Sequence, residues 1–303
     1  MCAQRSVKAL GIDLGGTNIR AAVVDASGTI LARRRIATPD EAGALAPPAQ
    51  LVAAMRDCAA PLLVEHPDCA ALGVGSGGQF NTATGVMRGI NTGDPRFVDY
   101  PIGAELQAAL GLPVCIDNDV KMAAYAELKL GAGRGLQHLI CVAVGTGIGG
   151  ALILNGELFQ GASGLAGHLG QIPDAQTGTE IEALAGGVPL GRIAQAQGVL
   201  SAQETTEQLF AKARAGDAAA AQVIERAGRA LGRVLVGLAH ALEPQRILLG
   251  GSVGIQPEYL AAINGALEAQ LMPAWRNIRA VPMQLGTNAG QIGAGLRAMT
   301  ELT

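Results

Sequence analysis

The feature that most constrains the fold is a glycine-rich turn between two apolar runs, because the chain contains it twice. The first turn is Gly15-Gly16 and the second is Gly145-Thr146-Gly147. The flanking apolar runs cover residues 7–14 and 19–24 in the first copy and residues 139–144 and 149–154 in the second. A third run follows each pair, so each copy predicts three successive antiparallel strands. We therefore expect an α/β protein of two related halves that face one cleft.

Helices and single strands alternate after each set of three strands. In the first half, helical spacing covers residues 48–64, 102–110 and 120–130, and buried strands cover 70–74 and 114–116. In the second half, the capping box Ser201-Ala202-Gln203-Glu204 predicts the start of a helix, and apolar spacing predicts a long amphipathic helix at 217–242. After it we expect a strand at 246–249, a helix at 259–271, a strand at 281–285 and a closing helix at 293–299. The predicted N-terminal lobe is residues 1–118, completed by a C-terminal helix at about 290–303, and the C-terminal lobe is residues 119–289.

One connection is unusually long. Residues 75–100 are rich in Gly, Asn, Thr and Asp. A stretch of this length exceeds a simple connection between two elements, so either function or disorder must explain it.

Composition excludes several classes of protein. The 303 residues suffice for two domains with separate cores, and no apolar run approaches the roughly 18 residues that a membrane span needs. A net charge of -3, no basic cluster and 3% aromatic residues argue against a nucleic-acid groove. The opening MCAQRS lacks the apolar region of a signal peptide, and the five scattered cysteines fit a reducing compartment rather than zinc. We expect a soluble, cytoplasmic protein with small ligands and no nucleic-acid or membrane partner.

Each glycine-rich turn is a candidate phosphate site. Asp13 precedes Gly15, Gly16, Thr17 and Asn18, so a carboxylate stands at a strand end beside glycines whose N–H groups can approach an anion. Either turn alone would be explained as a tight hairpin, but a matched pair favours two jaws around one polyphosphate. Asp13 would hold Mg2+ through water, because Mg2+ keeps much of its hydration. A weaker signal, Gly250-Gly251 after a later strand, would admit the nucleoside.

Asp117-Asn118-Asp119 forms a polar cluster at a strand-to-helix junction. A single Asp there would be explained as a helix cap. Three polar residues after a buried strand instead favour Asp119 as the general base for a substrate hydroxyl, with Asn118 helping to hold a sugar. Phosphoryl transfer needs little more than alignment, charge neutralisation and a base, which these segments could supply.

Several motifs in register resemble the ROK family of sugar kinases and regulators. They are GIDLGGTN, the loop with Gly77-Gly78 and Asn91, IDND, VGTGIGG with GASGLAGHLG, and LLGGSVG, and they cover nearly the whole chain. The resemblance implies an actin-like ATPase (ribonuclease H-like) fold of two lobes, ATP and Mg2+ as cofactors, and transfer to the 6-hydroxyl of a hexose. It also implies that Asp119 is the base and that Gly77, Asn91, Asn118, His168 and Glu182 lie on the sugar.

The chain departs from the family pattern after His168. Gln171 stands where ROK kinases carry a zinc-binding histidine, and no cysteine lies between Gln171 and Glu182. A thiolate cage cannot be built from Asp174, Gln176, Thr177 and Thr179, so we expect no zinc site.

His168 stands where the family usually has a sugar-binding glutamate. A carboxylate accepts hydrogen bonds from two hydroxyls, whereas a neutral imidazole offers one donor and one acceptor, so the sugar preference should change. Bacterial N-acetylmannosamine kinases of the family are similar to this chain here and at GGSVG. We therefore favour N-acetylmannosamine, with glucose, fructose and other hexosamines as alternatives.

A different class of function is a ROK protein that regulates rather than catalyses. Repressors of the family carry a helix-turn-helix segment before the first phosphate motif, and only ten residues precede Gly11. A non-catalytic sugar sensor would explain the lost zinc loop, but both phosphate turns and Asp119 are intact. We expect a catalytic homodimer whose lobes close on the sugar.

Overall fold

The computed structural model describes residues 7–41 and 43–302, so Cys2 and the MCAQRS segment lie outside the described residues. The chain divides into two compact units. Unit 1 consists of Met1–Gly131, Gln160–Ala166 and Thr287–Thr303, and unit 2 of Ala132–Phe159 and Gly167–Gly286. The predicted boundary lies between residues 118 and 119, whereas the division in the structure falls after the helix that starts at Asp119.

Unit 1 is built on a five-stranded sheet. In sheet order its strands are β3 (Ile30–Ala37), β2 (Asn18–Asp25), β1 (Lys8–Leu14), β6 (Cys69–Ser76) and β9 (Val114–Asn118). The pairs β3–β2 and β2–β1 are antiparallel, and the pairs β1–β6 and β6–β9 are parallel. The parallel strands therefore end at the same edge, where the polar residues after β1, β6 and β9 gather.

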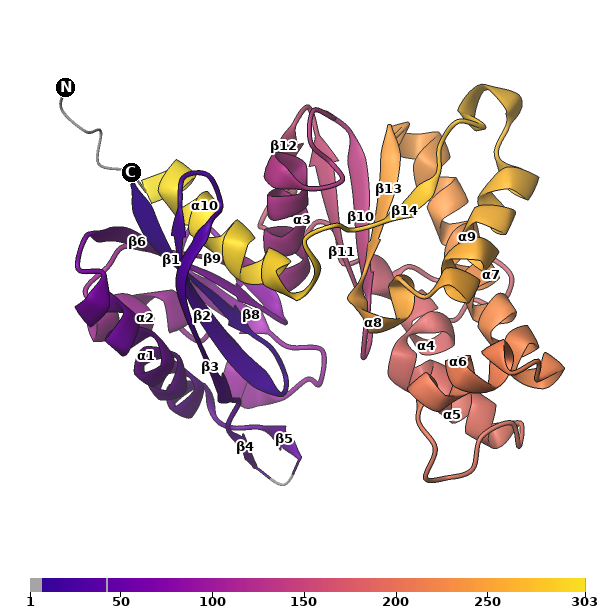
Figure 1. Cartoon of the computed structure of the whole chain (residues 1–303), viewed down its shortest axis with the longest axis horizontal. Helices are drawn as coiled ribbons and strands as arrows, with labels where there is room; N and C mark the ends of the chain where they lie inside the picture. Colours follow the sequence, from indigo (N-terminus) through magenta and orange to yellow (C-terminus); the bar gives the residue numbers. More distant parts are fainter. Residues whose placement is uncertain (1–6, 42, 303) are drawn as a thin grey trace. The chain divides into compact units, whose positions relative to one another are not determined.

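Helices cover both faces of this sheet (Figure 1). They are α1 (Pro48–Glu65) and α2 (Ile102–Leu110) on one face and α3 (Asp119–Leu130) and α10 (Ala289–Leu302) on the other. Helix α10 approaches very closely, because a Cβ atom at Gly11 would lie 2.0 Å from the carbonyl oxygen of Gln291 and one at Gly73 would lie 1.9 Å from that of Ala294. Helix α3 packs on α10 in the same way, which explains why it belongs to unit 1.

The long connection over residues 75–100 contains ordered structure. It holds the hairpin of β7 (Gln79–Asn81) and β8 (Val86–Gly89), followed by the short helix η1 (Pro95–Phe97). Phe80, Met87 and Phe97 are each 1% exposed, so the connection contributes to the core of unit 1. A smaller hairpin, β4 (Asp40–Glu41) with β5 (Ala44–Leu45), precedes α1.

Unit 2 repeats the strand order of unit 1. Its sheet runs β12 (Glu157–Leu158), β11 (Ile148–Leu154), β10 (Leu139–Val144), β13 (Arg246–Gly250) and β14 (Ala280–Pro282). The first two pairs are again antiparallel and the last two parallel. The remaining elements are η2 (Leu169–Gln171), α4 (Ile181–Ala185), α5 (Gly187–Ala196), α6 (Thr206–Arg214), α7 (Ala218–Leu242), α8 (Gly251–Gly254), α9 (Pro257–Gln270), η3 (Pro273–Trp275) and, before α10, η4 (Gly286–Asn288).

The long amphipathic helix is present as α7, and its buried stripe includes Ile224, Leu231 and Leu235. Asp217 caps it by accepting hydrogen bonds from two backbone N–H groups. The capping box predicted at Ser201 is wrong, because the N–H of Ser201 donates to Glu204 within a turn and no helix starts there. Helix α6 instead begins after Thr205, which forms the box with Gln208.

The described cysteines Cys58, Cys69, Cys115 and Cys141 are buried and form no disulfide. Within residues 7–41 and 43–302, every helix falls short of the length and apolar character needed to cross a bilayer. Strand β14 covers Ala280–Pro282, whereas the sequence predicts a strand at 281–285.

Candidate functional site

A cavity of about 240 Å³ lies at the carboxyl edge of the unit 1 sheet. Ligands of open α/β sheets commonly bind at this edge, because the loops that follow parallel strands meet there. Five of the predicted site residues line the cavity: Gly15, Gly16, Gly77, Asn91 and Asp119. Leu14, Leu45, Ser76, Gly78, Ile90 and Thr92 complete its wall.

The first glycine-rich turn is held in place from strand β3 and the residue after it. The hydroxyl of Thr38 donates to the carbonyl oxygen of Gly15 at 2.7 Å. The backbone N–H of Thr38 donates to the carbonyl oxygen of Thr17 at 3.1 Å. Arg35 Nε donates to Asn18 Oδ1 at 2.7 Å. A Cβ atom at Gly16 would meet nothing within 4 Å, so the turn presents open backbone to the cavity. Thr38 and Arg35 are residues that sequence reasoning missed.

Asp13 lies beside this turn in an ion pair with Arg20, whose Nη1 is 3.0 Å from Asp13 Oδ2. The pairing follows from the β1–β2 register, which sets these two residues opposite each other. Burial raises the pKa of Asp13, and the guanidinium of Arg20 opposes that rise. One carboxylate oxygen is therefore committed to Arg20, and the other is available to a hydrated cation.

Asp119 is the first residue of α3 and borders the cavity. Its Oδ1 accepts a hydrogen bond from the N–H of Val120 at 2.8 Å. Burial raises the pKa of Asp119 to about 6, and the negative charge of Asp13 adds to the rise. A carboxylate tuned toward neutrality beside an open cavity is suited to proton transfer.

Two amide side chains flank Asp119. Asn118 caps α3 by accepting the N–H of Val120 at 3.0 Å, and its Nδ2 donates to the carbonyl oxygen of Gly78 at 3.3 Å. Gln79 Nε2 donates to Asn91 Oδ1 at 2.9 Å, so Gln79 orients the exposed amide of Asn91. Sequence reasoning missed Gln79, because only the β7–β8 hairpin brings it beside Asn91.

The second glycine-rich turn, in unit 2, is open at Gly145, where a Cβ atom would meet nothing within 4 Å, and closely packed at Gly147. The carbonyl oxygens of Gly145 and Thr146 accept the N–H groups of Gly187 and Val188 at the start of α5, at 2.9 and 3.0 Å. Gly251 has a φ of 79°, and a Cβ atom there would lie 2.3 Å from the carbonyl oxygen of Val144. Gly250 ends β13 and Gly251 begins α8, and close packing accounts for the glycine at 251.

Glu182 of α4 ties three parts of unit 2 together. Its Oε2 accepts the N–H of Ile148 at 2.7 Å, and it would be 2.3 Å from a Cβ atom at Gly147. The same carboxylate lies close to Gly170 in η2, the short helix that begins after the half-buried His168. The structure thus joins Gly147 to Glu182 and places His168 at the end of the neighbouring η2.

The shortened segment between Gln171 and Glu182 is closed by an ion pair. Asp174 is fully buried, and its Oδ1 accepts from Arg233 Nε of α7 at 2.8 Å. Thr177 donates to Asp174 Oδ2 at 3.2 Å, and a β-bridge pairs Pro173 with Glu180. The hydrogen bond from Arg233 lowers the pKa of Asp174. Within residues 7–41 and 43–302, no group of three or more His, Cys, Asp or Glu side chains could hold a metal ion.

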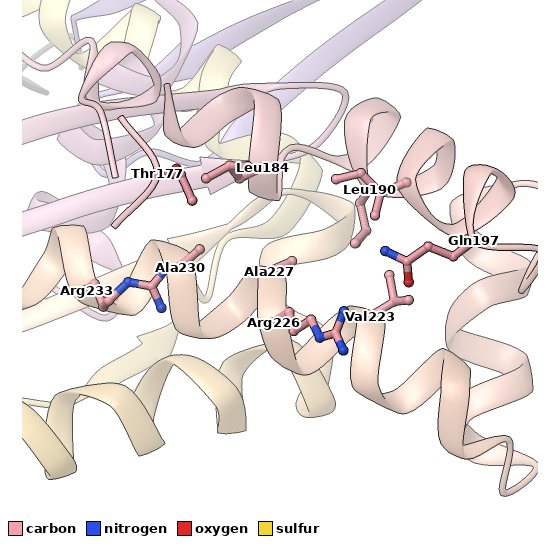
Figure 2. Close-up of a pocket in the computed structure, with 10 residues that line it drawn as sticks. Thr177, Leu184, Leu190, Gln197, Val223, Arg226, Ala227, Ala230 and Arg233 are labelled. Carbon is pink, nitrogen blue, oxygen red and sulfur yellow. The ribbon is translucent and has the colours of Figure 1, made fainter. Parts of the chain in front are cut away.

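A second cavity, of about 220 Å³, lies beside this segment in unit 2. Figure 2 shows Leu184 and Leu190 on one side of it and Val223, Ala227 and Ala230 of α7 on the other. Its wall is apolar apart from Thr177, Gln197, Arg226 and Arg233. None of the residues that line this cavity is a carboxylate, a histidine or a lysine.

Residues 9–300 match the ROK family. The chain belongs to the ROK family. It is 34% identical to an N-acetylmannosamine kinase of Yersinia pseudotuberculosis, over 97% of this chain and 99% of that protein. It is 30% identical to a glucokinase of Halalkalibacterium halodurans, over 94% of this chain and 93% of that protein.

Solved structures extend the comparison to the fold. A ROK family glucokinase from Streptomyces griseus, in complex with glucose and AMPPNP, is similar with a TM-score of 0.82 and 28% identity, over 97% of this chain and 99% of that chain. The predicted fold class, an actin-like ATPase fold of the α/β class, is confirmed by this similarity and by the repeated five-stranded sheets.

Proposed function

We propose that this ROK protein is an ATP-dependent sugar kinase that phosphorylates the 6-hydroxyl of an N-acetylhexosamine, with N-acetylmannosamine the favoured substrate. The observation that carries the proposal is Asp119, a carboxylate with a pKa raised to about 6 that borders a cavity beside a glycine-rich turn. In the proposed reaction Asp119 accepts the proton of the attacking hydroxyl, and the sugar is aligned by Asn91 and Asn118.

Asp13 fits a magnesium ion of the kind that accompanies ATP. A single carboxylate with one oxygen already bonded to Arg20 suits a cation that keeps most of its water and takes its other ligands from phosphates. Bound there, Mg2+ would neutralise charge on the phosphates. We assign Gly15–Asn18, Gly145–Gly147 and Gly250–Gly251 to the nucleotide, and we assign no zinc.

The wall of the unit 1 cavity supports an N-acetylated sugar over a plain hexose. It combines polar groups at Ser76, Asn91 and Asp119 with apolar side chains at Leu14, Leu45 and Ile90. An acetamido methyl can contact the apolar side while the hydroxyls meet the polar side. His168 and Glu182 are assigned to the sugar as well, and the similarity to an N-acetylmannosamine kinase supports the same choice.

Two alternatives have specific support. The similarity to a glucokinase favours glucose, and a fructokinase activity belongs to the same reaction class. A non-catalytic sugar sensor would bind sugar without turnover. It is disfavoured because both glycine-rich turns and Asp119 are present in the chain.

A coupled assay of ADP formation over N-acetylmannosamine, N-acetylglucosamine, mannose, glucose and fructose tests the proposal. We expect sugar-dependent ADP, with the highest kcat/KM for N-acetylmannosamine. Equal or better turnover of glucose would remove the substrate assignment, and binding without turnover of any sugar would favour the sensor. His168→Glu should lower the ratio of N-acetylmannosamine to glucose activity, because a carboxylate accepts from two hydroxyls.

A further inference from the structure

Lys121 of α3 is a buried lysine in unit 1. Its side chain is 1% exposed, as is that of Asp117 near the end of β9. A buried ammonium is costly unless each of its three N–H groups has a partner. Lys121 Nζ donates to Gln160 Oε1 at 2.8 Å and to the carbonyl oxygen of Gly164 at 2.5 Å, and it lies 3.5 Å from Asp117 Oδ1. The lysine therefore has no donor left for a ligand.

Two of these partners come from a distant part of the chain. Residues 160–166 belong to unit 1, although the chain on both sides of them belongs to unit 2. They form a closed loop, because the N–H of Ala166 donates to the carbonyl oxygen of Gln160 at 3.1 Å. A Cβ atom at Gly164 would lie 2.6 Å from the carbonyl oxygen of Phe80, so the loop packs closely on β7. The lysine thus holds the 160–166 loop on unit 1 through hydrogen bonds to Gln160 and Gly164.

Asp117 connects this loop to the candidate base. One of its oxygens accepts the N–H of Asn118 at 2.7 Å, and the other accepts Gln160 Nε2 at 2.8 Å. Asn118 in turn accepts the N–H of Val120, immediately after Asp119. A continuous set of hydrogen bonds therefore runs from the loop to the backbone that carries Asp119.

We propose that Lys121 is a positioning residue that, with Asp117 and Gln160, latches the 160–166 loop to the strand end carrying Asp119. The latch acts on the backbone next to Asp119, which is assigned to the sugar site, and it therefore rests on the proposed function. It predicts an effect on sugar binding and none on the nucleotide.

The first test compares Lys121→Met with Lys129→Met, a matched substitution at an exposed position of the same helix. Lys121→Met should raise the KM for the sugar about tenfold and leave the KM for ATP within about twofold. Backbone amides of residues 160–166 should exchange hydrogen about tenfold faster than in the wild type. Lys129→Met should change none of these values.

A second variant separates positioning from general stability. Lys121→Met leaves Asp117 as an unpaired buried carboxylate, which lowers Tm. The double variant Lys121→Met/Asp117→Asn removes that charge and should recover most of the lost Tm, while its sugar KM stays raised because the bonds to the loop are still absent. Recovery of the sugar KM together with Tm would show that Lys121 acts only on stability and would overturn the proposal.

Gln160→Ala decides the matter if Lys121→Met does not fold, because Gln160 is only half-buried. It should change the sugar KM and the loop exchange in the same direction, by about threefold. Unchanged values in Gln160→Ala would overturn the latch. If the wild type phosphorylates no sugar, the proposed function fails, while the exchange measurements still test whether Lys121 holds the loop.

Discussion

The two sheets have the same strand order but differ in the residues at their carboxyl edges. In unit 1 the ends of β1 and β9 carry Asp13, Asp117 and Asp119, whereas in unit 2 β10 ends at Val144 and β13 at Gly250. The turn after β10 is hydrogen-bonded to α5 and contacts Glu182 at Gly147, whereas a Cβ atom at Gly16 in the turn after β1 would meet nothing within 4 Å. Strand order determines where the loops meet and leaves their side chains free to change. In unit 1 the carboxylates therefore stand at or directly after the strand ends, whereas in unit 2 the carboxylate beside the turn comes from a helix, α4.

The largest effect should come from replacing Asp119, because no described strand end of unit 2 carries a carboxylate in the corresponding place. Asp119→Asn should lower kcat on the order of 10³-fold and leave sugar binding by calorimetry nearly unchanged, because the amide keeps the shape but cannot accept the proton. In the wild type, kcat/KM should fall as pH drops below about 6, where Asp119 becomes protonated. Asp57→Asn, on the exposed side of α1, is the control. Undiminished turnover by Asp119→Asn would remove it as the base.

The contrast between the two turns can be tested with alanine. Gly147→Ala would bring a Cβ atom to 2.3 Å from Glu182 Oε2, so the carboxylate must move and the N–H of Ile148 loses its acceptor. We expect unfolding to become easier by about 2 kcal/mol and the sugar KM to rise about tenfold. Gly16→Ala meets no neighbour within 4 Å and should change stability by less than about 0.5 kcal/mol. Equal Tm values for the two variants would show that the second turn is as open as the first.

Each unit has an ion pair with a buried carboxylate: Lys121–Asp117 in unit 1 and Arg233–Asp174 in unit 2. A substitution at Asp174 breaks the second pair and leaves the first intact. Asp174→Asn should cost about 2 kcal/mol, because it removes a charged hydrogen bond to Arg233. Since the pKa of Asp174 is lowered in the fold, this stability is present above the pKa of the unfolded chain and is lost as pH falls through the folded value. Denaturant unfolding from pH 7 to pH 3 should show the gap between variant and wild type closing. Glu225→Gln, which breaks an exposed pair on α7, should cost less than about 0.5 kcal/mol throughout.

The smallest effect concerns the stability that the fold loses when the buried Asp119 is ionised. The pKa of Asp119 is raised in the fold, so its contribution to stability is fully present below the unfolded value near 4 and is lost as pH rises through about 6. Asp119→Asn should therefore be more stable than the wild type at pH 8, by on the order of 1 to 2 kcal/mol, and no more stable at pH 4. Thermal unfolding at the two pH values measures this, and a variant that is less stable at pH 8 would contradict it.

Local patterns predicted the parts of the fold that local physics determines. The runs on either side of Gly15-Gly16 are strands because apolar residues end abruptly at glycines, and α7 follows from its apolar stripe and its stop at Pro244. In unit 1, local patterns predicted Gly15, Gly16 and Asp119, and the resemblance to the ROK family implied Gly77 and Asn91; all five line one cavity.

Tertiary partners could not be predicted in the same way. Lys121 looks like an ordinary helix residue until Asp117, Gln160 and Gly164 surround it, and two of these are remote in sequence. The prediction of a helix start at Ser201 was wrong because the same pattern also forms a turn. The helix starts after Thr205, which makes the capping box instead. Residues that position a site through side-chain contacts leave no periodic signal, so they emerge only when the fold is known.

Helix α10 has a consequence for how the chain is made. It fills the face of the unit 1 sheet against Gly11 and Gly73, yet it follows every residue of unit 2 in the chain. On the ribosome, the strands of unit 1 emerge first, but the part of that face around Gly11 and Gly73 stays uncovered until the last helix is released. Unit 2 has all its elements earlier, so the half that is translated first completes its folding last. A premature stop just before α10 would leave an intact unit 2 attached to an unfinished sheet.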